Sequence, residues 1–147
     1  APDSTKTTLK INDYKQLLAI TTEGYEAGYL YDSLARVKAI VHNILVRDTT
    51  IHHAQGLFRI SMNYQHPRDE MKGIFCDLDF PEWMLLYCGL EVLMFNPTEV
   101  VTQADTTQDA MDRTSLAYEY NSLKFPTKIK MEGHNSMLID IKYCELK

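Results

Sequence analysis

Asp77 and Asp79 are the residues whose spacing comes closest to a catalytic arrangement. Two carboxylates one residue apart at the end of a strand can hold a magnesium ion, and one of them can attack a phosphorus atom. The bulky pair Phe80-Pro81 follows where such a site needs a small turn, and no later lysine and acidic pair completes the site. Alternation along a strand instead places both carboxylates on one solvated face. We therefore interpret Asp77 and Asp79 as surface residues.

The histidines and cysteines are not spaced as a metal site or an activated nucleophile requires. No two histidines lie three or four residues apart, and the three cysteines, Cys76, Cys88 and Cys144, stand singly in apolar stretches. Protein zinc sites usually contain ligand pairs at such short spacings. We expect the cysteines to be small buried side chains in a reducing compartment. A cysteine–histidine pair brought together only by the fold stays open.

Cofactor binding is not indicated either. The six glycines form no dinucleotide-binding or phosphate-cradling loop. We predict no cofactor and no metal. The lack of a catalytic constellation favours a non-enzymatic protein.

The chain is acidic, with a net charge of −5 over 147 residues. Residues 48–120 hold twelve acidic and four basic side chains, and a negative surface of this kind repels phosphate backbones. Nucleic acid is therefore disfavoured as a partner. No apolar run reaches the roughly 20 residues of a membrane-spanning helix, and no export signal opens the chain. We expect a soluble protein without a membrane partner, located in the cytoplasm or otherwise inside the cell.

These features favour a protein that works through protein contacts: an inhibitor, an immunity-type neutraliser or a structural subunit, with a homo-oligomer also open. Tyrosine occurs nine times and supplies contact area with a polar tip. The acidic segment 69–112 is the expected face. The candidate binding residues are Tyr31, Leu57, Phe75, Asp77, Asp79 and Glu82.

The alternative is a small-ligand-binding protein or a small enzyme with a pocket between a sheet and a long helix. The candidate pocket residues are Tyr64, His66 and Trp83. A closed cavity with convergent polar groups would favour this alternative, whereas a filled core and an exposed tyrosine patch would favour the protein-binding hypothesis.

The elements that must position these side chains begin with a predicted helix over residues 22–45. Apolar residues recur there at three- and four-residue steps from Tyr25 to Leu45, and Thr22 can cap the start. A shorter helix is predicted over residues 13–20. The longer helix should lie along the whole core.

After Val46 the apolar period changes from about 3.6 to 2, which indicates strands. Residues 58–64 and 74–80 are predicted to form a hairpin with Met62 opposite Ile74, because this register collects the apolar side chains on one face. Residues 67–69 make its turn.

The C-terminal half predicts three further features. Pro81 suits the first position of a short helix that ends at Tyr87. Strands are predicted over residues 98–103 and 115–120. A last hairpin has Met131 opposite Met137, Ile129 opposite Ile139 and Lys128 opposite Asp140.

Together these elements predict an α+β fold, in which an antiparallel sheet built from hairpins packs against one long N-terminal helix. No internal repeat or linker divides the chain. Residues 1–8 are expected to be a flexible N-terminus, and residues 9–147 a single globular domain.

Overall fold

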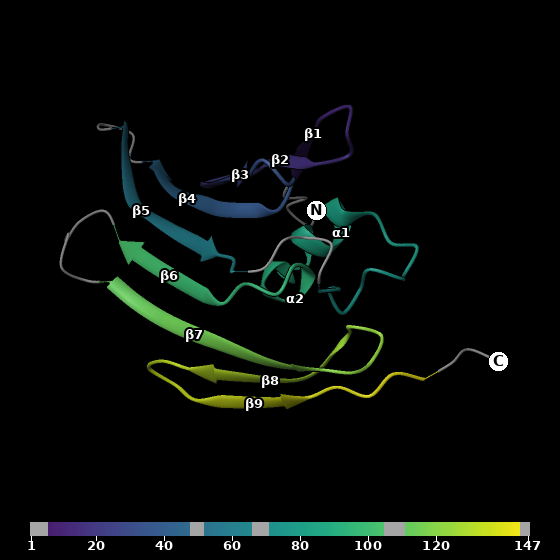
Figure 1. Cartoon of the computed structure of the whole chain (residues 1–147). Helices are drawn as coiled ribbons and strands as arrows, with labels where there is room; N and C mark the ends of the chain where they lie inside the picture. Colours follow the sequence, from purple (N-terminus) through teal and green to yellow (C-terminus); the bar gives the residue numbers. More distant parts are fainter. Residues whose placement is uncertain (1–5, 48–51, 66–70, 105–110, 145–147) are drawn as a thin grey trace, which may run out of the picture.

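The computed structural model describes residues 6–47, 52–65, 71–104 and 111–144, with the backbone alone at residues 44–47, 52–57 and 104. Nine strands and two short helices form within these ranges (Figure 1). In chain order they are β1 (Thr8–Ile11), β2 (Leu17–Thr22), β3 (Tyr25–Tyr31), β4 (Val37–Arg47), β5 (His52–Asn63), α1 (Glu82–Tyr87), α2 (Glu91–Met94), β6 (Glu99–Ala104), β7 (Met111–Tyr120), β8 (Pro126–Glu132) and β9 (Met137–Asp140).

All nine strands form one antiparallel sheet in which every strand pairs with its neighbours in the sequence. Alternate connections of such a meander lie at the same end of the sheet. The β1–β2, β3–β4 and β7–β8 turns therefore lie at the end where the β5–β6 connection carries both helices. Figure 1 shows the sheet curving around the helices, with β2 and β3 on one side of them and β7 to β9 on the other.

The helices are held by apolar burial against the sheet. Leu86 of α1 and Met94 of α2 join a core with Tyr29, Ile40 and Met62 of three sheet strands, and none of these side chains is more than 8% exposed. Burying a side chain of this size contributes roughly 1.5–3 kcal/mol. Helices of six and four residues without side-chain caps need this support, because isolated short helices are unstable. No helix in the described ranges is long and apolar enough to cross a membrane.

Three turns at the helical end of the sheet share one design. Each opens with an Asn or Asp whose side-chain oxygen accepts hydrogen bonds of 2.9–3.0 Å from the backbone N–H groups two and four residues later. The opening residues are Asn12, Asp32 and Asn121. The fourth residue of each turn has a left-handed backbone, at Lys15, Ala35 and Lys124. Asn and Asp are common in turns because their side chains make such bonds.

The predicted helix over residues 22–45 is wrong, because these residues form β3 and β4 joined by the Asp32 turn. When two successive strands are taken as one segment, their apolar residues recur at the three- and four-residue spacing that is typical of a helix. Aromatic and β-branched residues such as Tyr29 and Val41 favour strands, and the side-chain bonds of Asp32 compete with a helix. The helix predicted over 13–20 is also wrong, since β2 begins at Leu17. The fold is therefore largely all-β, and the described residues contain no long N-terminal helix that covers the sheet.

The hairpin predicted between residues 58–64 and 74–80 is wrong in its second strand. β5 pairs with β4 and β6, so that Ile60 lies opposite Ile40 and Thr102. Residues 71–80 form turns and irregular backbone. Alternation showed that β5 is a strand, but alternation carries no information on which strand lies beside it. The turn predicted at 67–69 lies outside the described residues.

The C-terminal predictions are confirmed. β8 and β9 pair with Met131 opposite Met137 and Lys128 opposite Asp140, although the ammonium of Lys128 lies nearest to Glu119, at 3.7 Å. α1 confirms the helix that follows Pro81. β6 and β7 confirm strands in the two segments predicted.

Candidate functional site

A cavity of about 390 Å³ lies at the helical end of the sheet. Its outer wall is residues 71–80, called here the outer-wall segment, and the other walls come from the helices, the β3–β4 turn and the end of β7. The apolar lining includes Phe75, Leu78, Phe80, Leu85, Met94 and Phe95. The polar lining consists of Arg36, Lys72, Cys76, Glu82, Asn96 and Tyr120.

Close backbone contacts hold the outer-wall segment in place. The Asn96 Nδ2 group donates to the carbonyl of Lys72 at 2.7 Å, and the N–H of Lys72 donates to the carbonyl of Lys124 at 3.1 Å. Gly73 lies so near α2 that a Cβ there would stand 1.8 Å from the Met94 carbonyl oxygen. Glycine is required for this approach because any side chain would collide with backbone.

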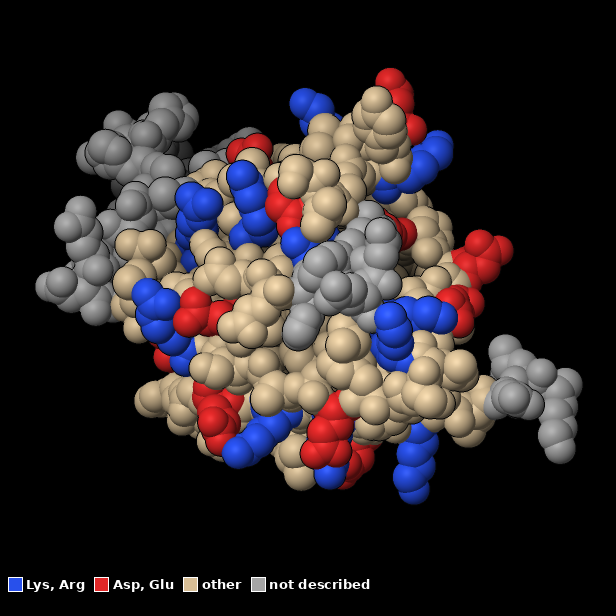
Figure 2. All heavy atoms as spheres, viewed as in Figure 1, with Lys and Arg blue, Asp and Glu red and all other residues tan. Residues whose placement is uncertain are grey.

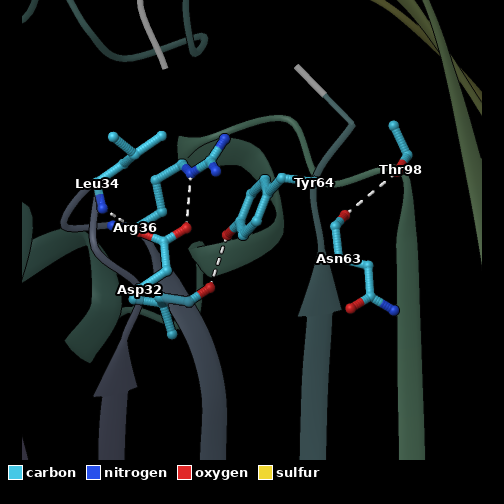
Figure 3. A network of polar contacts seen from close by, with 7 residues as sticks. Asp32, Leu34, Arg36, Asn63, Tyr64 and Thr98 are labelled. Atoms are coloured by element: carbon cyan, nitrogen blue, oxygen red, sulfur yellow. Dashed lines mark hydrogen bonds and ion pairs between the residues drawn. The ribbon is translucent and has the colours of Figure 1, made fainter. Parts of the chain in front are cut away.

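Arg36 is a buried residue of the cavity lining, and Figure 3 shows its side chain beside those of Asp32 and Tyr64. Its Nε donates to Asp32 Oδ2 at 2.9 Å, and its guanidinium carbon lies 4.3 Å from the centroid of the Tyr64 ring. The Tyr64 hydroxyl donates to the Val37 carbonyl at 2.7 Å, which fixes that ring. Burial opposes ionisation of Asp32, but hydrogen bonds from Arg36 and Leu34 outweigh it and lower the pKa of Asp32. Arg36 thus has a carboxylate counter-charge within the protein.

Two polar atoms in the cavity wall are buried and have no hydrogen-bond partner among the described residues: Asn96 Oδ1 and the Tyr120 hydroxyl. Asn96 is 6% exposed, and its φ of 55° is a left-handed conformation that asparagine tolerates better than most residues. Burial raises the pKa of Tyr120, and hydrogen bonding from the Asn96 side chain toward the hydroxyl oxygen partly offsets this effect, so it is the O–H donor of Tyr120 that is left without an acceptor among the described residues. Tyr120 is therefore a neutral O–H group. Buried polar atoms are almost always paired with protein or water, so these two mark a place for an outside partner.

The unpartnered hydroxyl sets Tyr120 apart from other tyrosines of the sheet. The hydroxyl groups of Tyr31, Tyr64, Tyr118 and Tyr143 each donate to a backbone carbonyl 2.6–2.8 Å away. Tyr118 lies two residues from Tyr120 on the same strand. The two residues form a matched pair for experiments, since one hydroxyl is bonded within the protein and the other is not.

The lining residues differ in exposure. Leu78 and Phe80 of the outer-wall segment are 46% and 54% exposed, and the polar residues Lys72 and Cys76 are also exposed. Arg36, Asn96 and Met94, by contrast, are buried.

The structure places only some of the predicted binding residues at the cavity. Phe75 and Glu82 line the cavity, whereas Asp77 and Asp79 are exposed on the outer-wall segment. On the face shown in Figure 2, basic side chains lie among the acidic ones, and neither sign forms a separate block.

The other predicted site residues have structural positions or lie outside the described part. Tyr31 is half-buried, its hydroxyl bonds to the backbone, and burial with a lesser effect of Glu82 raises its pKa to about 12. Tyr64 supports Arg36, and Trp83 packs partly buried against the core. The side chain of Leu57 and the whole of His66 lie outside the described residues.

Sequence reasoning missed Arg36, Asn96 and Tyr120. A usable signal was the similarity of Tyr31-Asp32-Ser33-Leu34 to Tyr120-Asn121-Ser122-Leu123. Arg36 ends the first of these turns, and Tyr120 precedes the second. Because equivalent turns of a meander lie at one end of the sheet, the two residues lie at the same end.

The prediction of buried cysteines is wrong, because Cys76, Cys88 and Cys144 are all exposed. Cys76 lies in the outer-wall segment, which is not a strand, and Cys88 follows α1. Burial, followed by the Asp77 carboxylate that accepts its S–H bond at 3.4 Å, raises the pKa of the Cys76 thiol. Of the three thiols, that of Cys76 lines the cavity.

A second hollow of about 510 Å³ lies along β5, β6 and β7 and shares Tyr120 with the first cavity, and some of its polar side chains pair with one another. Asn63 Nδ2 donates to Glu99 at 2.8 Å, and Arg113 forms an ion pair with Glu99 at 3.2 Å. It is larger than the first cavity, but Asn96, whose Oδ1 is buried without a partner among the described residues, lines only the first. The first cavity is therefore the stronger candidate.

His42 lies among aromatic rings outside the cavity lining. Its Nδ1 shares a hydrogen bond with the Tyr25 hydroxyl, its ring stacks on Phe58 with centroids 4.3 Å apart, and its Nε2 is buried with no partner in the described part of the chain. Burial lowers the pKa of His42. No group of three or more His, Cys, Asp or Glu side chains within the described ranges is arranged to hold a metal ion.

Comparison with known proteins assigns no family. No family model and no curated protein matches the chain. Among solved structures, a porin-like protein from Bacteroides uniformis ATCC 8492 aligns with 95% of this chain and 77% of its own, at 10% sequence identity and a TM-score of 0.23. At that TM-score the alignment supports neither a shared fold nor a shared function.

Proposed function

We propose that this chain binds a small molecule with an apolar body and a polar group in the cavity behind the outer-wall segment. The observation that carries the proposal is the pair of buried atoms, Asn96 Oδ1 and the Tyr120 hydroxyl, that lack a partner among the described residues in a wall of mixed apolar and polar side chains. Water can serve them in the free protein, and the polar group of a ligand can replace that water.

The size and lining of the cavity support this function. Small-molecule sites typically have volumes of roughly 300–1,000 Å³, apolar walls and a few placed polar groups. An apolar ligand body would also remove the exposed surface of Leu78 and Phe80 from water, which contributes roughly 25 cal/mol per Å².

The cavity favours binding over catalysis. Cys76 is a nucleophile by residue type, but none of the described residues lining the cavity is a histidine that could act as its base. Its raised pKa also keeps it in the less reactive thiol form near neutral pH.

The test uses octan-1-ol as a probe and two reporters in the native chain. Trp83 is the single tryptophan and adjoins Glu82 of the cavity lining, so its fluorescence should change saturably on titration. Bound octan-1-ol should slow maleimide labelling of Cys76 and leave Cys88 and Cys144 unaffected.

A pair of variants controls for binding elsewhere. Cys76→Phe should fill part of the cavity and weaken the fluorescence response, whereas Cys88→Phe, outside the lining, should retain it. A Cys76 labelling rate that does not change with probe concentration, together with no saturable fluorescence change, would refute the proposal.

A second candidate function is the binding of a protein partner to the outside of the same segment. Leu78, Phe80 and Tyr87 are 46%, 54% and 50% exposed, close in sequence to the exposed Asp77 and Asp79. Exposed apolar residues rimmed by charges are typical of interfaces. Replacing both aspartates by lysine should weaken partner capture from the native source, and Tyr120→Phe should not; equal capture by all three proteins would contradict this function.

A further inference from the structure

We infer that the ligand carries a neutral group that both accepts and donates a hydrogen bond, such as a hydroxyl or a primary carboxamide, and that this group enters the cavity first. The inference rests on the proposed function and names its ligand class. Three features of the cavity wall lead to it.

The first feature is the complementary chemistry of the two unpartnered atoms. The Asn96 Nδ2 group is bonded to the Lys72 carbonyl, so the orientation of the amide is fixed and Oδ1 is left as an acceptor. The Tyr120 O–H group is a donor with no acceptor among the described residues. A ligand group that contacts both atoms must donate to Asn96 and accept from Tyr120.

The second feature is the balance of charge around the cavity. Arg36 is paired with Asp32 at 2.9 Å. The other charged residues in the cavity lining are Lys72 and Glu82, which have opposite charges. The Lys72 ammonium lies 4.6 Å from the centroid of the Phe125 ring, and Phe125 is not part of the lining. An ion brought into this balanced site would lose hydration without gaining an uncompensated counter-charge.

The third feature is the contrast between exposed apolar side chains and buried polar atoms in the lining. Leu78 and Phe80 are exposed on the outer-wall segment, and the Asn96 side chain and the Tyr120 hydroxyl are buried. An amphiphilic molecule satisfies both regions only when its polar group lies inside and its hydrocarbon part lies against the outer-wall segment. The opposite orientation would leave the two buried atoms facing hydrocarbon.

The experiment compares probes of matched chain length: octan-1-ol, octanamide, octanoate, octylammonium and 1-methoxyheptane, which only accepts hydrogen bonds. Affinities are measured on the unmodified protein by Trp83 fluorescence and by protection of Cys76. Octan-1-ol and octanamide should bind about fivefold more tightly than 1-methoxyheptane, because a neutral hydrogen bond in a buried site contributes roughly 1 kcal/mol and the ether makes one of the two. They should bind at least about tenfold more tightly than either ion, because the ions lose hydration in the cavity.

Tyr120→Phe should weaken the binding of octan-1-ol and of 1-methoxyheptane by about the same factor, because both probes accept a hydrogen bond from the Tyr120 hydroxyl. Tyr118→Phe should leave both affinities unchanged, because the Tyr118 hydroxyl is already bonded to the Pro97 carbonyl at 2.6 Å. The affinities of the probes for the unmodified protein test the inference even if neither variant folds.

The outcomes separate this inference from the proposed function. Equal affinity for the alcohol, the ether and the ions would overturn the inference while leaving an apolar binding cavity in place. Tightest binding of octanoate would overturn it in favour of an anionic ligand. Absence of binding by every probe would refute the proposed function as well.

Discussion

Tyr118 and Tyr120 lie two residues apart on β7, on the same face of the sheet, and their hydroxyl groups have different surroundings. The Tyr118 hydroxyl donates to the Pro97 carbonyl, and burial raises its pKa well above the ordinary value. The Tyr120 hydroxyl is buried without a partner in the described chain. At the scale of single residues, this difference separates a hydroxyl that stabilises the fold from one available to a ligand.

Phenylalanine at each of these positions should affect stability differently. Tyr118→Phe should lower the free energy of unfolding by about 1 kcal/mol, because it removes a made hydrogen bond and leaves a carbonyl unpaired. Tyr120→Phe should leave that free energy unchanged or raise it, because no protein bond is lost. Urea titrations of both variants measure the difference; equal losses would mean that Tyr120 also bonds within the fold.

His42 should make stability depend on pH in the acid range. Because burial lowers its pKa in the folded state, the unfolded chain, with a histidine pKa of about 6.5, binds the proton more readily. The stability contributed by neutral His42 is therefore present above about pH 6.5 and is lost as pH falls through the folded-state pKa.

The measurement is the free energy of unfolding as a function of pH for the native chain and for His42→Phe, which should show a smaller loss on acidification. His134→Gln, at an exposed position, is the control and should keep the native slope. The same slope in all three proteins would exclude His42 as the cause.

Cys76 should react slowly with maleimide near neutral pH. Burial and then the Asp77 carboxylate raise the pKa of its thiol, and the thiolate is the reactive form. Asp77→Asn removes the negative charge and should speed labelling of Cys76 at a given pH, with no change at Cys144. Mass spectrometry of timed reactions gives the two rates, and an unchanged Cys76 rate would show that Asp77 does not control the thiol.

The outer-wall segment and α2 form one structural unit at the scale of elements. Gly73 permits their approach, and Asn96 ties the end of α2 to the backbone of Lys72. The helices are too short to stand alone. The cavity wall therefore depends on the contacts between this segment and α2.

Alanine at two glycines tests that unit. At Gly73 a Cβ would collide with the Met94 carbonyl oxygen, so Gly73→Ala should lower the free energy of unfolding by roughly 1–3 kcal/mol or more and weaken octan-1-ol binding. At Gly28 of β3 a Cβ meets nothing within 4 Å, so Gly28→Ala should be neutral or stabilising by up to about 1 kcal/mol. Thermal melts compare them, and equal effects would contradict the close approach at Gly73.

The whole molecule is a meander in which neighbouring strands in sequence are neighbours in space. The central strands are paired on both sides, and β3, β4 and β5 carry part of the apolar core. Among the described strands, β1 and β9 are the edges, with four residues each and one neighbour. Stability should therefore decrease from the centre of the sheet to its edges.

Amide hydrogen exchange should show this gradient. The amides of Ile40 and Met62 should exchange slowly, through global unfolding, and those of Lys10 and Leu138 should exchange first through local opening. Exchange mass spectrometry or NMR resolves these positions. Protection of Leu138 equal to that of Ile40 would show that β9 is covered by another strand, from a second copy or from further chain.

The sequence by itself determined the features that depend on adjacent residues. Pro81 and the residues after it predicted α1, and the apolar alternation of residues 128–140 predicted the register of β8 on β9. Alternation also showed that residues 58–64 contain a strand. These signals are local, because turn chemistry and side-chain alternation operate over a few residues.

Only the tertiary structure decided which strand lies beside which, and therefore where the site is. A helical stripe and two strands in succession have similar apolar spacing over residues 22–45, and only the partners of β3 and β4 distinguish them. Arg36, Asn96 and Tyr120 are far apart in the sequence and meet because the sheet curves around the helical connection at one end. The curvature of the sheet and the choice of strand partners depend on packing contacts throughout the chain. A short stretch of sequence therefore does not determine them.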